Sequence, residues 1–189
     1  MNKAAAVLSV QFADHTACPR FGCKGPGAGS WLAAQGCRVP MSPNSATLDA
    51  DGVFVARLAT SEFLIEAVEG GGERVAAMRA GLADRTRPPH VYPVPRQDQV
   101  LTISGAGLQG LLRQTCSVDF APLLESAAAA DGPVVLTSMI GVAVVAWPRR
   151  RAGSPAVTLW CEPSYAHYFR NTLLEVGEGQ GNITRGGAR

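Results

Sequence analysis

The sequence predicts an α+β protein made of two similar βαββα-type halves, in which mainly antiparallel sheets carry helices on one face. Two observations lead to this prediction. Short runs of alternating apolar residues, typical of strands, occur with amphipathic helical stretches in the order strand, helix, hairpin, helix, and this order occurs twice. A glycine-rich segment of the first half also returns in the second half.

The repeat is the most informative feature of the chain. Residues 24–32 align without a gap on residues 103–111, at an offset of 79 residues. The matched pairs at this offset are Leu32 with Leu111, Cys37 with Cys116 and Val39 with Val118. Chance similarity between two Gly/Ala-rich helix starts is the alternative interpretation, but three matches in register favour duplication of a strand–helix unit.

The first half begins with a strand over residues 21–24, followed by a helix. Pro26 suits the first turn of that helix, where its missing N–H costs nothing, and Gly36 suits the left-handed residue that ends it. A hairpin over 52–58 and 62–67 and a helix over 73–82 complete this half.

The second half repeats the pattern. A strand over 100–104 precedes a helix with leucines at buried spacing, and a hairpin over 134–140 and 142–147 turns at Gly141. A strand over 156–161 and a helix over 165–176 close it. Trp31 and Trp160 are expected in the core.

The expected organisation follows from these elements. Four prolines between Pro88 and Pro95 predict a stiff, extended connection, and five glycines after residue 176 predict a flexible tail. The segments are residues 1–19 (N-terminal segment), 20–84 (first half), 85–96 (Pro-rich strap), 97–176 (second half) and 177–189 (tail).

Composition excludes several classes of protein. The chain has 189 residues, 47% hydrophobic and 17% charged, with a formal net charge of +2, which disfavours a disordered or strongly basic nucleic-acid-binding protein. The apolar N-terminal stretch is too short for a signal peptide, and residues 133–148 are too few and too interrupted to span a membrane. We therefore expect a cytoplasmic protein that binds neither membranes nor nucleic acid.

The search for chemistry gives no self-contained catalytic, cofactor or metal site. His15, Cys18 and Cys23 have plausible zinc-ligand spacings but lack a fourth ligand nearby, so reduced thiols are the preferred interpretation. A nucleophilic Cys37–His90 pair is the weaker alternative to an inert thiol. Residues 24–29 match no phosphate-binding pattern and favour close helix–sheet packing instead.

A short basic run follows the last apolar strand of the hairpin. Trp147 and Pro148 precede Arg149, Arg150 and Arg151, which on their own suggest a solvated loop. Trp and Arg are enriched in interface hot spots, so Trp147 and the three arginines are also the candidate contact with a partner protein.

An ordered series of residues resembles the gamma subunit of heterotetrameric sarcosine oxidase. In the first half the series is Gly22-Cys23-Lys24-Gly25-Pro26-Gly27-Ala28, Trp31-Leu32, Gly36, Val39-Pro40, Pro43-Asn44, Leu58 and Ser61-Glu62-Phe63-Leu64-Ile65. In the second half it comprises residues 101–112, Cys116, Asp119-Phe120, residues 142–148 and residues 164–169. Departures at 88–95, 126–130 and 149–151 leave open a sister complex such as N-methylglutamate dehydrogenase.

This resemblance implies a fold like the folate-binding domain of the glycine-cleavage aminomethyltransferases. It also implies a non-catalytic subunit that works with alpha, beta and delta subunits, which hold FAD, FMN, NAD, zinc and tetrahydrofolate and oxidatively demethylate sarcosine or a related N-methyl amine. Much of the surface would then be buried against those subunits. An independent folate-dependent one-carbon enzyme and an unrelated interaction module are the alternatives.

Overall fold

The computed structural model describes residues 9–84, 88–128 and 130–178 and shows a mixed α+β protein with mainly antiparallel sheets, which confirms the predicted class. The chain divides into two units. The first unit consists of Thr16–Gln97 with Ala128–Val135. The second unit consists of Met1–His15, Asp98–Ala127 and Leu136–Arg189.

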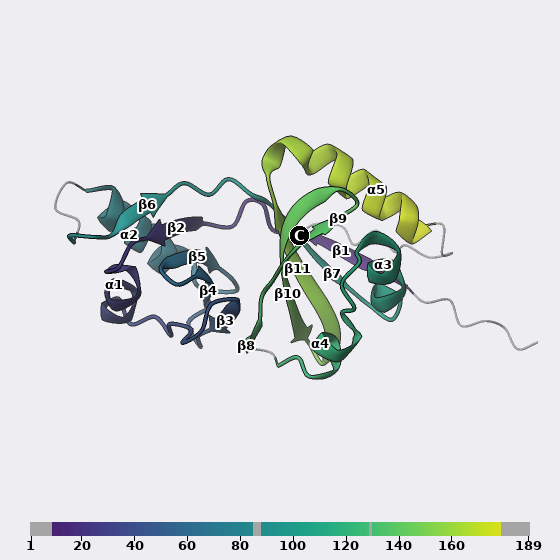
Figure 1. Ribbon diagram of the computed structural model, residues 1–189, viewed down its shortest axis with the longest axis horizontal. Helices are drawn as coiled ribbons and strands as arrows, with labels where there is room; N and C mark the ends of the chain where they lie inside the picture. The colour runs from purple at the N-terminus through teal and green to yellow at the C-terminus, as the bar shows by residue number, and fades with distance from the viewer. Residues whose placement is uncertain (1–8, 85–87, 129, 179–189) are drawn as a thin grey trace, which may run out of the picture. The chain divides into compact units, whose positions relative to one another are not determined.

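The first unit is built on a six-stranded sheet in the order β6-β2-β5-β4-β3-β8 (Figure 1). Its elements are β2 (Arg20–Lys24), α1 (Ala28–Ala34), β3 (Ser45–Leu48), β4 (Val53–Ala59), β5 (Glu62–Ala67), α2 (Gly72–Ala83), β6 (Tyr92–Val94) and β8 (Asp131–Pro133). Alternate side chains of the sheet, such as Phe21, Phe63 and Ile65, form one core with Leu32 of α1 and Met78 of α2. We call this side of the sheet the helix-covered face and the opposite side the helix-free face.

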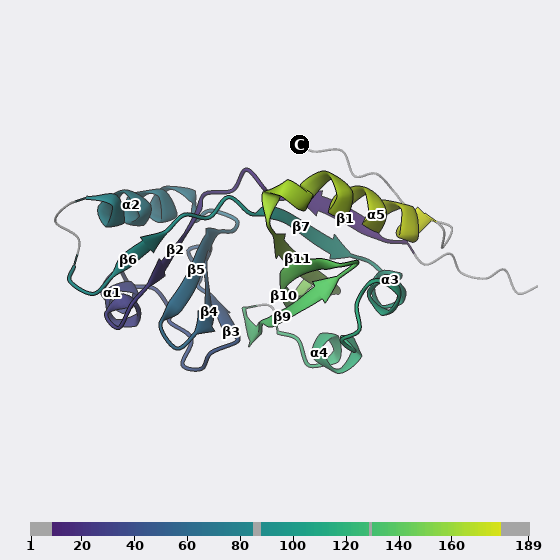
Figure 2. The ribbon, with the colours of Figure 1, turned by 45° about the horizontal axis from the view of Figure 1, so that its top comes forward.

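The second unit is built on a five-stranded sheet in the order β1-β7-β11-β10-β9 (Figure 2). Its elements are β1 (Gln11–Asp14), β7 (Gln99–Ser104), α3 (Leu108–Thr115), α4 (Ala121–Glu125), β9 (Val135–Met139), β10 (Val142–Arg151), β11 (Ser154–Cys161), the 3₁₀ turn η1 (Pro163–Tyr165) and α5 (Ala166–Glu178). Arg150 and Pro155 line a cavity with residues of α3 and α4, which identifies their side of the sheet as the helix-covered face.

The two sheets share one topology. The order β6-β2-β5-β4-β3 of the first unit corresponds, strand by strand, to β1-β7-β11-β10-β9 of the second. The edge strands come from outside the repeats, since β6 in the Pro-rich strap pairs with β2 and β1 near the N-terminus pairs with β7. The expected N-terminal segment (1–19) and Pro-rich strap (85–96) therefore each contribute one strand to a sheet, β1 and β6 respectively. Strand β8 is an addition to the first unit, supplied by residues between α4 and β9.

The structural repeat has an offset of 80 residues in the strand–turn–helix, one more than the sequence alignment suggests. Gly25 and Gly105 have φ values of 116° and 112°, and the helix caps Gly27 and Gly107 have φ values of −85° and −83°. The 79-residue alignment would put equivalent strand residues on opposite faces of the two sheets. Helix α3 is one residue longer than α1, but Cys116 follows it directly, whereas Gln35 and Gly36 separate α1 from Cys37, so the offset falls to 79 residues at the two cysteines.

Most predicted elements are present, with altered ends. Strand β10 continues to Arg151, so the three arginines lie in a strand and not in the expected loop. Strands β3 and β8 and helix α4 were not predicted. Helix α5 extends to Glu178, and the rest of the expected tail lies outside the described residues. Across the described ranges, no helix combines the length and the apolar character needed to cross a membrane.

Candidate functional site

Trp147 and Arg149, two of the candidate contacts with a partner protein, are buried side chains of β10. Trp147 is 1% exposed and Arg149 is 7% exposed, and the Arg149 guanidinium lies 4.6 Å from the centre of the Trp147 ring. Both project from the helix-free face of β10, because they alternate with Arg150. A cation over an aromatic face is a stabilising contact, and a role of these two side chains in a partner interface stays a prediction.

The other two arginines of the run have local roles. Arg150 is exposed and its Nη2 donates to the Gly153 carbonyl at 2.7 Å, across the β10–β11 turn. Arg151 is half-buried, with Nη1 3.5 Å from Nε2 of His15. A partner contact through Arg150 or Arg151 stays a prediction. As expected, Trp160 is buried, whereas Trp31 is half-buried and packs edge-on against Phe21 at 6.3 Å.

The thiols of the buried cysteines are poor nucleophiles. Burial raises the pKa of Cys23 from 9.0 to about 12, with a smaller contribution from the neighbouring Cys37. Burial also raises the pKa of Cys161 to about 11, helped by Asp98 and Glu162. Because the thiolate is the reactive form, neither cysteine suits catalysis near neutral pH.

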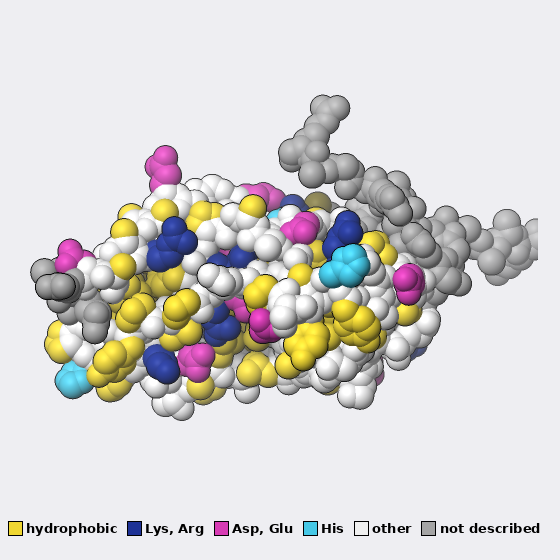
Figure 3. All heavy atoms as spheres, turned by 90° about the horizontal axis from the view of Figure 1, so that it is seen from above, with side chains coloured by type: hydrophobic (Ala, Val, Ile, Leu, Met, Phe, Trp, Pro, Cys, Tyr) yellow, Lys and Arg dark blue, Asp and Glu magenta, His cyan; other side chains and the backbone are white. Residues whose placement is uncertain are grey.

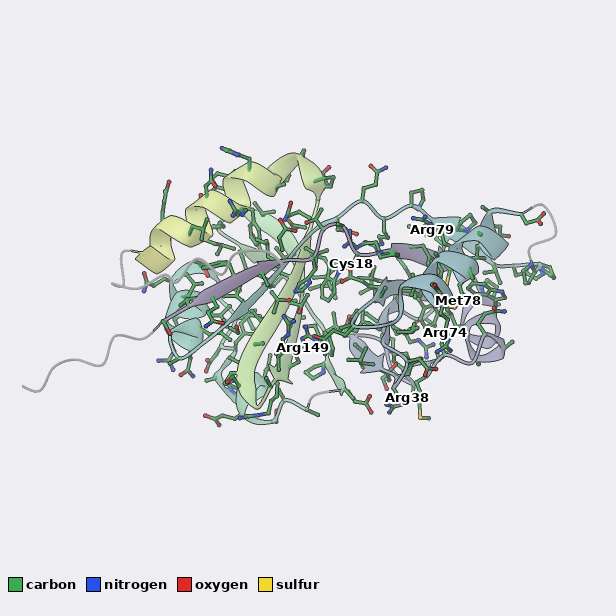
Figure 4. All side chains as sticks on the ribbon, turned by 180° about the vertical axis from the view of Figure 1, so that it is seen from behind. Cys18, Arg38, Arg74, Met78, Arg79 and Arg149 are labelled. Atoms are coloured by element: carbon green, nitrogen blue, oxygen red, sulfur yellow. The ribbon has the colours of Figure 1, made fainter. Side chains whose placement is uncertain are left out.

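Cys37, which the sequence offered as a nucleophile, is part of the core of the first unit. Its Sγ donates to Met78 Sδ at 3.6 Å, and Arg74 Nη2 is 4.0 Å away. Figure 4 shows Arg74 and Met78 on helix α2. Burial raises its pKa, although the Arg74 charge opposes this. The sulfur therefore has a thioether and a guanidinium as neighbours, and not the general base that nucleophilic catalysis requires.

Arg74 joins three parts of the first unit. Its Nη1 is 2.8 Å from Asp49 Oδ2 and 3.1 Å from Asp51 Oδ2, and its Nη2 donates to the Gln35 carbonyl at 3.0 Å. The β3–β4 turn, the end of α1 and helix α2 are thus held by one side chain. Asp49 and Asp51, the two acidic residues of this turn, are therefore both paired with Arg74.

No group of three or more His, Cys, Asp or Glu side chains within the described ranges is placed to hold a metal ion. Among the three residues with zinc-ligand spacing, Cys23 is buried in the core of the first unit on the helix-covered face of β2. Its neighbours there are apolar side chains of α1 and α2.

The first unit contains a polar cavity lined by three arginines. Its volume is about 420 Å³, and its walls are the turn at residues 16–20, Arg79 of α2, Arg96 and Gln97. Figure 4 shows Cys18 on the turn and Arg79 on α2. This turn leads into β2, whose first residue, Arg20, has a side chain 4% exposed.

Two of the three guanidiniums have carboxylate partners in the first unit. Arg20 Nε donates to Glu66 Oε2 at 2.8 Å, and its Nη1 donates to the Thr16 carbonyl at 2.9 Å, which fixes the turn. Arg96 Nη2 lies 3.4 Å from Glu62 Oε1. Arg79 is exposed and forms no ion pair with any residue that the structure describes. Arg79 thus adds a positive charge to a cavity whose other two arginines have carboxylate partners.

Sequence reasoning did not find this cavity. Its arginines are 59 and 17 residues apart along the chain, in a strand, a helix and the strap, and none belongs to a charge run. On the face of the molecule shown in Figure 3, basic side chains are interspersed with acidic ones among hydrophobic and uncharged groups. Only the fold brings the three cations together.

Comparison with known proteins gives no relative: neither a protein-family model nor a curated protein sequence matches this chain.

Proposed function

We propose that the chain is a non-catalytic subunit of a flavoenzyme complex that oxidatively demethylates sarcosine or a related N-methyl amine. In this role it packs against the alpha, beta and delta subunits, which hold FAD, FMN, NAD, zinc and tetrahydrofolate. It also helps to wall the cavity through which the reactive imine intermediate moves, where exclusion of water prevents hydrolysis. The methylene group passes to tetrahydrofolate or leaves as formaldehyde.

The observation that carries this proposal is the duplicated α+β architecture. The resemblance to the sarcosine oxidase gamma subunit implies two related α+β halves with mainly antiparallel sheets, and the two units share a strand order. The likeness to the folate-binding domain of the aminomethyltransferases belongs to this proposal as well.

Exposed apolar side chains add support for a role in an assembly. Both units have large hydrophobic side chains that are exposed to solvent: Met41, Tyr92, Leu136, Tyr165 and Tyr168. Met41 is 93% exposed. Methionine and tyrosine are enriched at protein interfaces, so we expect several of these side chains to become buried in the complex.

The experiment is affinity purification of the tagged full chain from its native host at its natural expression level. The proposal requires stoichiometric partner chains, a flavin absorbance spectrum in the purified fraction, and turnover of sarcosine or another N-methyl amine. A fraction containing the chain alone, monodisperse and able to turn over an amine or a folate substrate, would instead support the independent one-carbon enzyme. A flavin-free assembly would support the unrelated interaction module.

A further inference from the structure

We infer that the arginine-lined cavity of the first unit binds a small organic anion through a carboxylate or phosphate group, with Arg79 as its principal charged contact. This inference is independent of the proposed function, since it concerns one unit of the chain and requires no partner subunit. It rests on three observations: the ion pairs of the cavity arginines, the different exposure of those arginines, and the volume of the cavity.

The charge balance favours an anion. Glu66 and Glu62 accompany Arg20 and Arg96, while Arg79 is the one cation of the cavity lacking an ion pair among the residues described. An incoming anionic group would therefore contact the Arg79 guanidinium without displacing either glutamate. Guanidinium groups recognise carboxylates and phosphates through paired N–H donors, which suits this chemistry.

The three arginines of the cavity differ in their exposure to solvent. The Arg20 side chain is 4% exposed, the Arg96 side chain is 16% exposed, and Arg79 is an exposed residue. The two inner cations are therefore fixed within the unit, while Arg79 faces solvent and remains accessible to a ligand. The positive charge of the accessible Arg79 attracts an anion from solution.

The remaining lining determines what else the ligand would carry. The volume of about 420 Å³ lies within the range of roughly 300–1,000 Å³ usual for small-molecule sites, so there is room for an organic body beside the anionic group. Thr16 and Gln97 supply polar groups on the lining, and Cys18 supplies a half-buried thiol. A small hydroxylated or amide-bearing acid fits this lining better than an apolar one.

Cys18 gives a way to measure the potential inside the cavity. Iodoacetate is an anion and iodoacetamide is neutral, so the ratio of their alkylation rates at a thiol reports local attraction of anions. Cys116 is also half-buried and lies in the second unit, which makes it an internal reference. We expect the ratio of the iodoacetate rate to the iodoacetamide rate to be about threefold or more higher at Cys18 than at Cys116. Peptide mapping of the alkylated native full chain measures both ratios.

Two variants sharpen this measurement. Arg79→Gln should lower the ratio at Cys18 toward that at Cys116, because it removes the accessible cation from the cavity. Arg170→Gln is the matched control, since Arg170 is an exposed arginine on helix α5, and it should leave both ratios unchanged. Equal ratios at Cys18 and Cys116, insensitive to Arg79→Gln, would count against the inference.

Direct titration supplies the deciding measurement. Amide NMR spectra of the full chain are recorded with inorganic phosphate, acetate or succinate, against sodium chloride at equal ionic strength. Saturable shifts at residues 16–20 and Arg79, with affinity reduced about tenfold by Arg79→Gln, would support the inference. Saturation by phosphate alone assigns a phosphate group, and saturation by acetate or succinate alone assigns a carboxylate. Shifts that do not saturate with any of the three would overturn it.

Discussion

The two units have the same backbone plan but different chemistry on their helix-free faces. At equivalent positions, the first unit pairs Arg20 with Glu66, whereas the second unit pairs Val100 with Trp160. The next equivalent pair is Gly22 with Leu64 in the first unit, and Thr102 with Thr158, joined by a 2.9 Å hydroxyl contact, in the second. The topology has therefore been kept while one face of each sheet has changed.

The turns between β2 and α1 and between β7 and α3 show which backbone contact the two units have in common. In the first unit the Gly27 N–H donates to the His90 carbonyl at 3.2 Å, and in the second the Gly107 N–H donates to the Ser9 carbonyl at 3.1 Å. The two carbonyls come from unrelated parts of the chain, each just before the edge strand of its sheet. The geometry is thus preserved although the segment that supplies the acceptor differs.

The buried ion pair between Arg20 and Glu66 is the largest difference between the units. Of the substitutions considered, Glu66→Gln should lower stability the most. The substitution leaves the Arg20 guanidinium buried without its carboxylate, which costs about 3–5 kcal/mol of unfolding free energy when a buried pair is broken. Urea denaturation followed by circular dichroism measures this loss. The result would be contradicted by a loss below about 1 kcal/mol, the usual value for an exposed pair.

The double substitution Arg20→Met/Glu66→Leu is the matched control for that prediction. It makes the position apolar, as in the second unit, and replacement of a whole buried pair is often neutral or stabilising by about 1–4 kcal/mol. The double variant should therefore be more stable than Glu66→Gln. Equal stability of the two variants would show that removal of the Glu66 charge beside Arg20 does not by itself cause the damage.

The turn glycines should be equally sensitive in both units. A Cβ on Gly25 would lie 2.3 Å from the His90 carbonyl oxygen, and one on Gly105 would lie 2.3 Å from that of Ser9. Both glycines also have a left-handed φ, so Gly25→Ala and Gly105→Ala should each cost about 2–4 kcal/mol, measured by urea unfolding.

Gly72→Ala is the control for the glycine variants. Gly72 begins helix α2 and has open space around the position of a Cβ. Alanine there should be neutral or stabilise by up to about 1 kcal/mol. If Gly105→Ala proved as harmless as Gly72→Ala, the two turns would not be equivalent.

Local patterns predicted the elements that depend on local chemistry. Short apolar runs identified β4, β5 and β11, most of whose consecutive residues are buried, and helical spacing identified α2, which buries Val75, Met78 and Leu82. The repeat was found, but its register was missed by one residue. The second half has no connecting residues between α3 and Cys116, whereas two residues separate α1 from Cys37, so the cysteines match at an offset of 79 while the strands before them match at 80.

What depends on long-range pairing could not be predicted. Strand β1 joins β7 although some 85 residues separate them, and β6 lies in a proline-rich segment with three residues in the sheet. Trp147 and Arg149 look like an exposed aromatic and basic run, yet they are buried beside each other. The candidate anion site has the same cause, since Arg20, Arg79 and Arg96 meet only after folding.

Each unit has a buried thiol with a raised pKa, Cys23 in the first and Cys161 in the second. Above about pH 9 the unfolded chain loses these protons while the folded chain keeps them, so the free energy of unfolding falls as pH rises. The loss continues up to about pH 11 for Cys161 and about pH 12 for Cys23. Each thiol contributes a slope of up to about 1.4 kcal/mol per pH unit.

The check is urea unfolding of the native sequence and of Cys23→Ala at a series of alkaline pH values. Alanine lowers stability at every pH because it leaves a small cavity, but it also removes one titrating group, so its stability should fall less steeply. Cys161→Ala should flatten the slope similarly, over a narrower pH range. Parallel slopes for all three proteins would refute the assignment of the pH dependence to these thiols.

The smallest effect concerns β8, the strand that the second unit lacks at the equivalent edge of its described sheet. Arg38 Nη2 lies 2.5 Å from Asp131 Oδ2 beside this strand, but both side chains are about half exposed, at 52% and 50%. Solvent screens such a pair, so Asp131→Asn should cost at most about 1 kcal/mol, and added salt should reduce the difference. The backbone pairing of Ser45 with Pro133 and Ala46 with Gly132 remains in the variant. If Asp131→Asn instead cost as much as Glu66→Gln, the exposed ion pair and not the backbone ladder would hold β8 on the first unit.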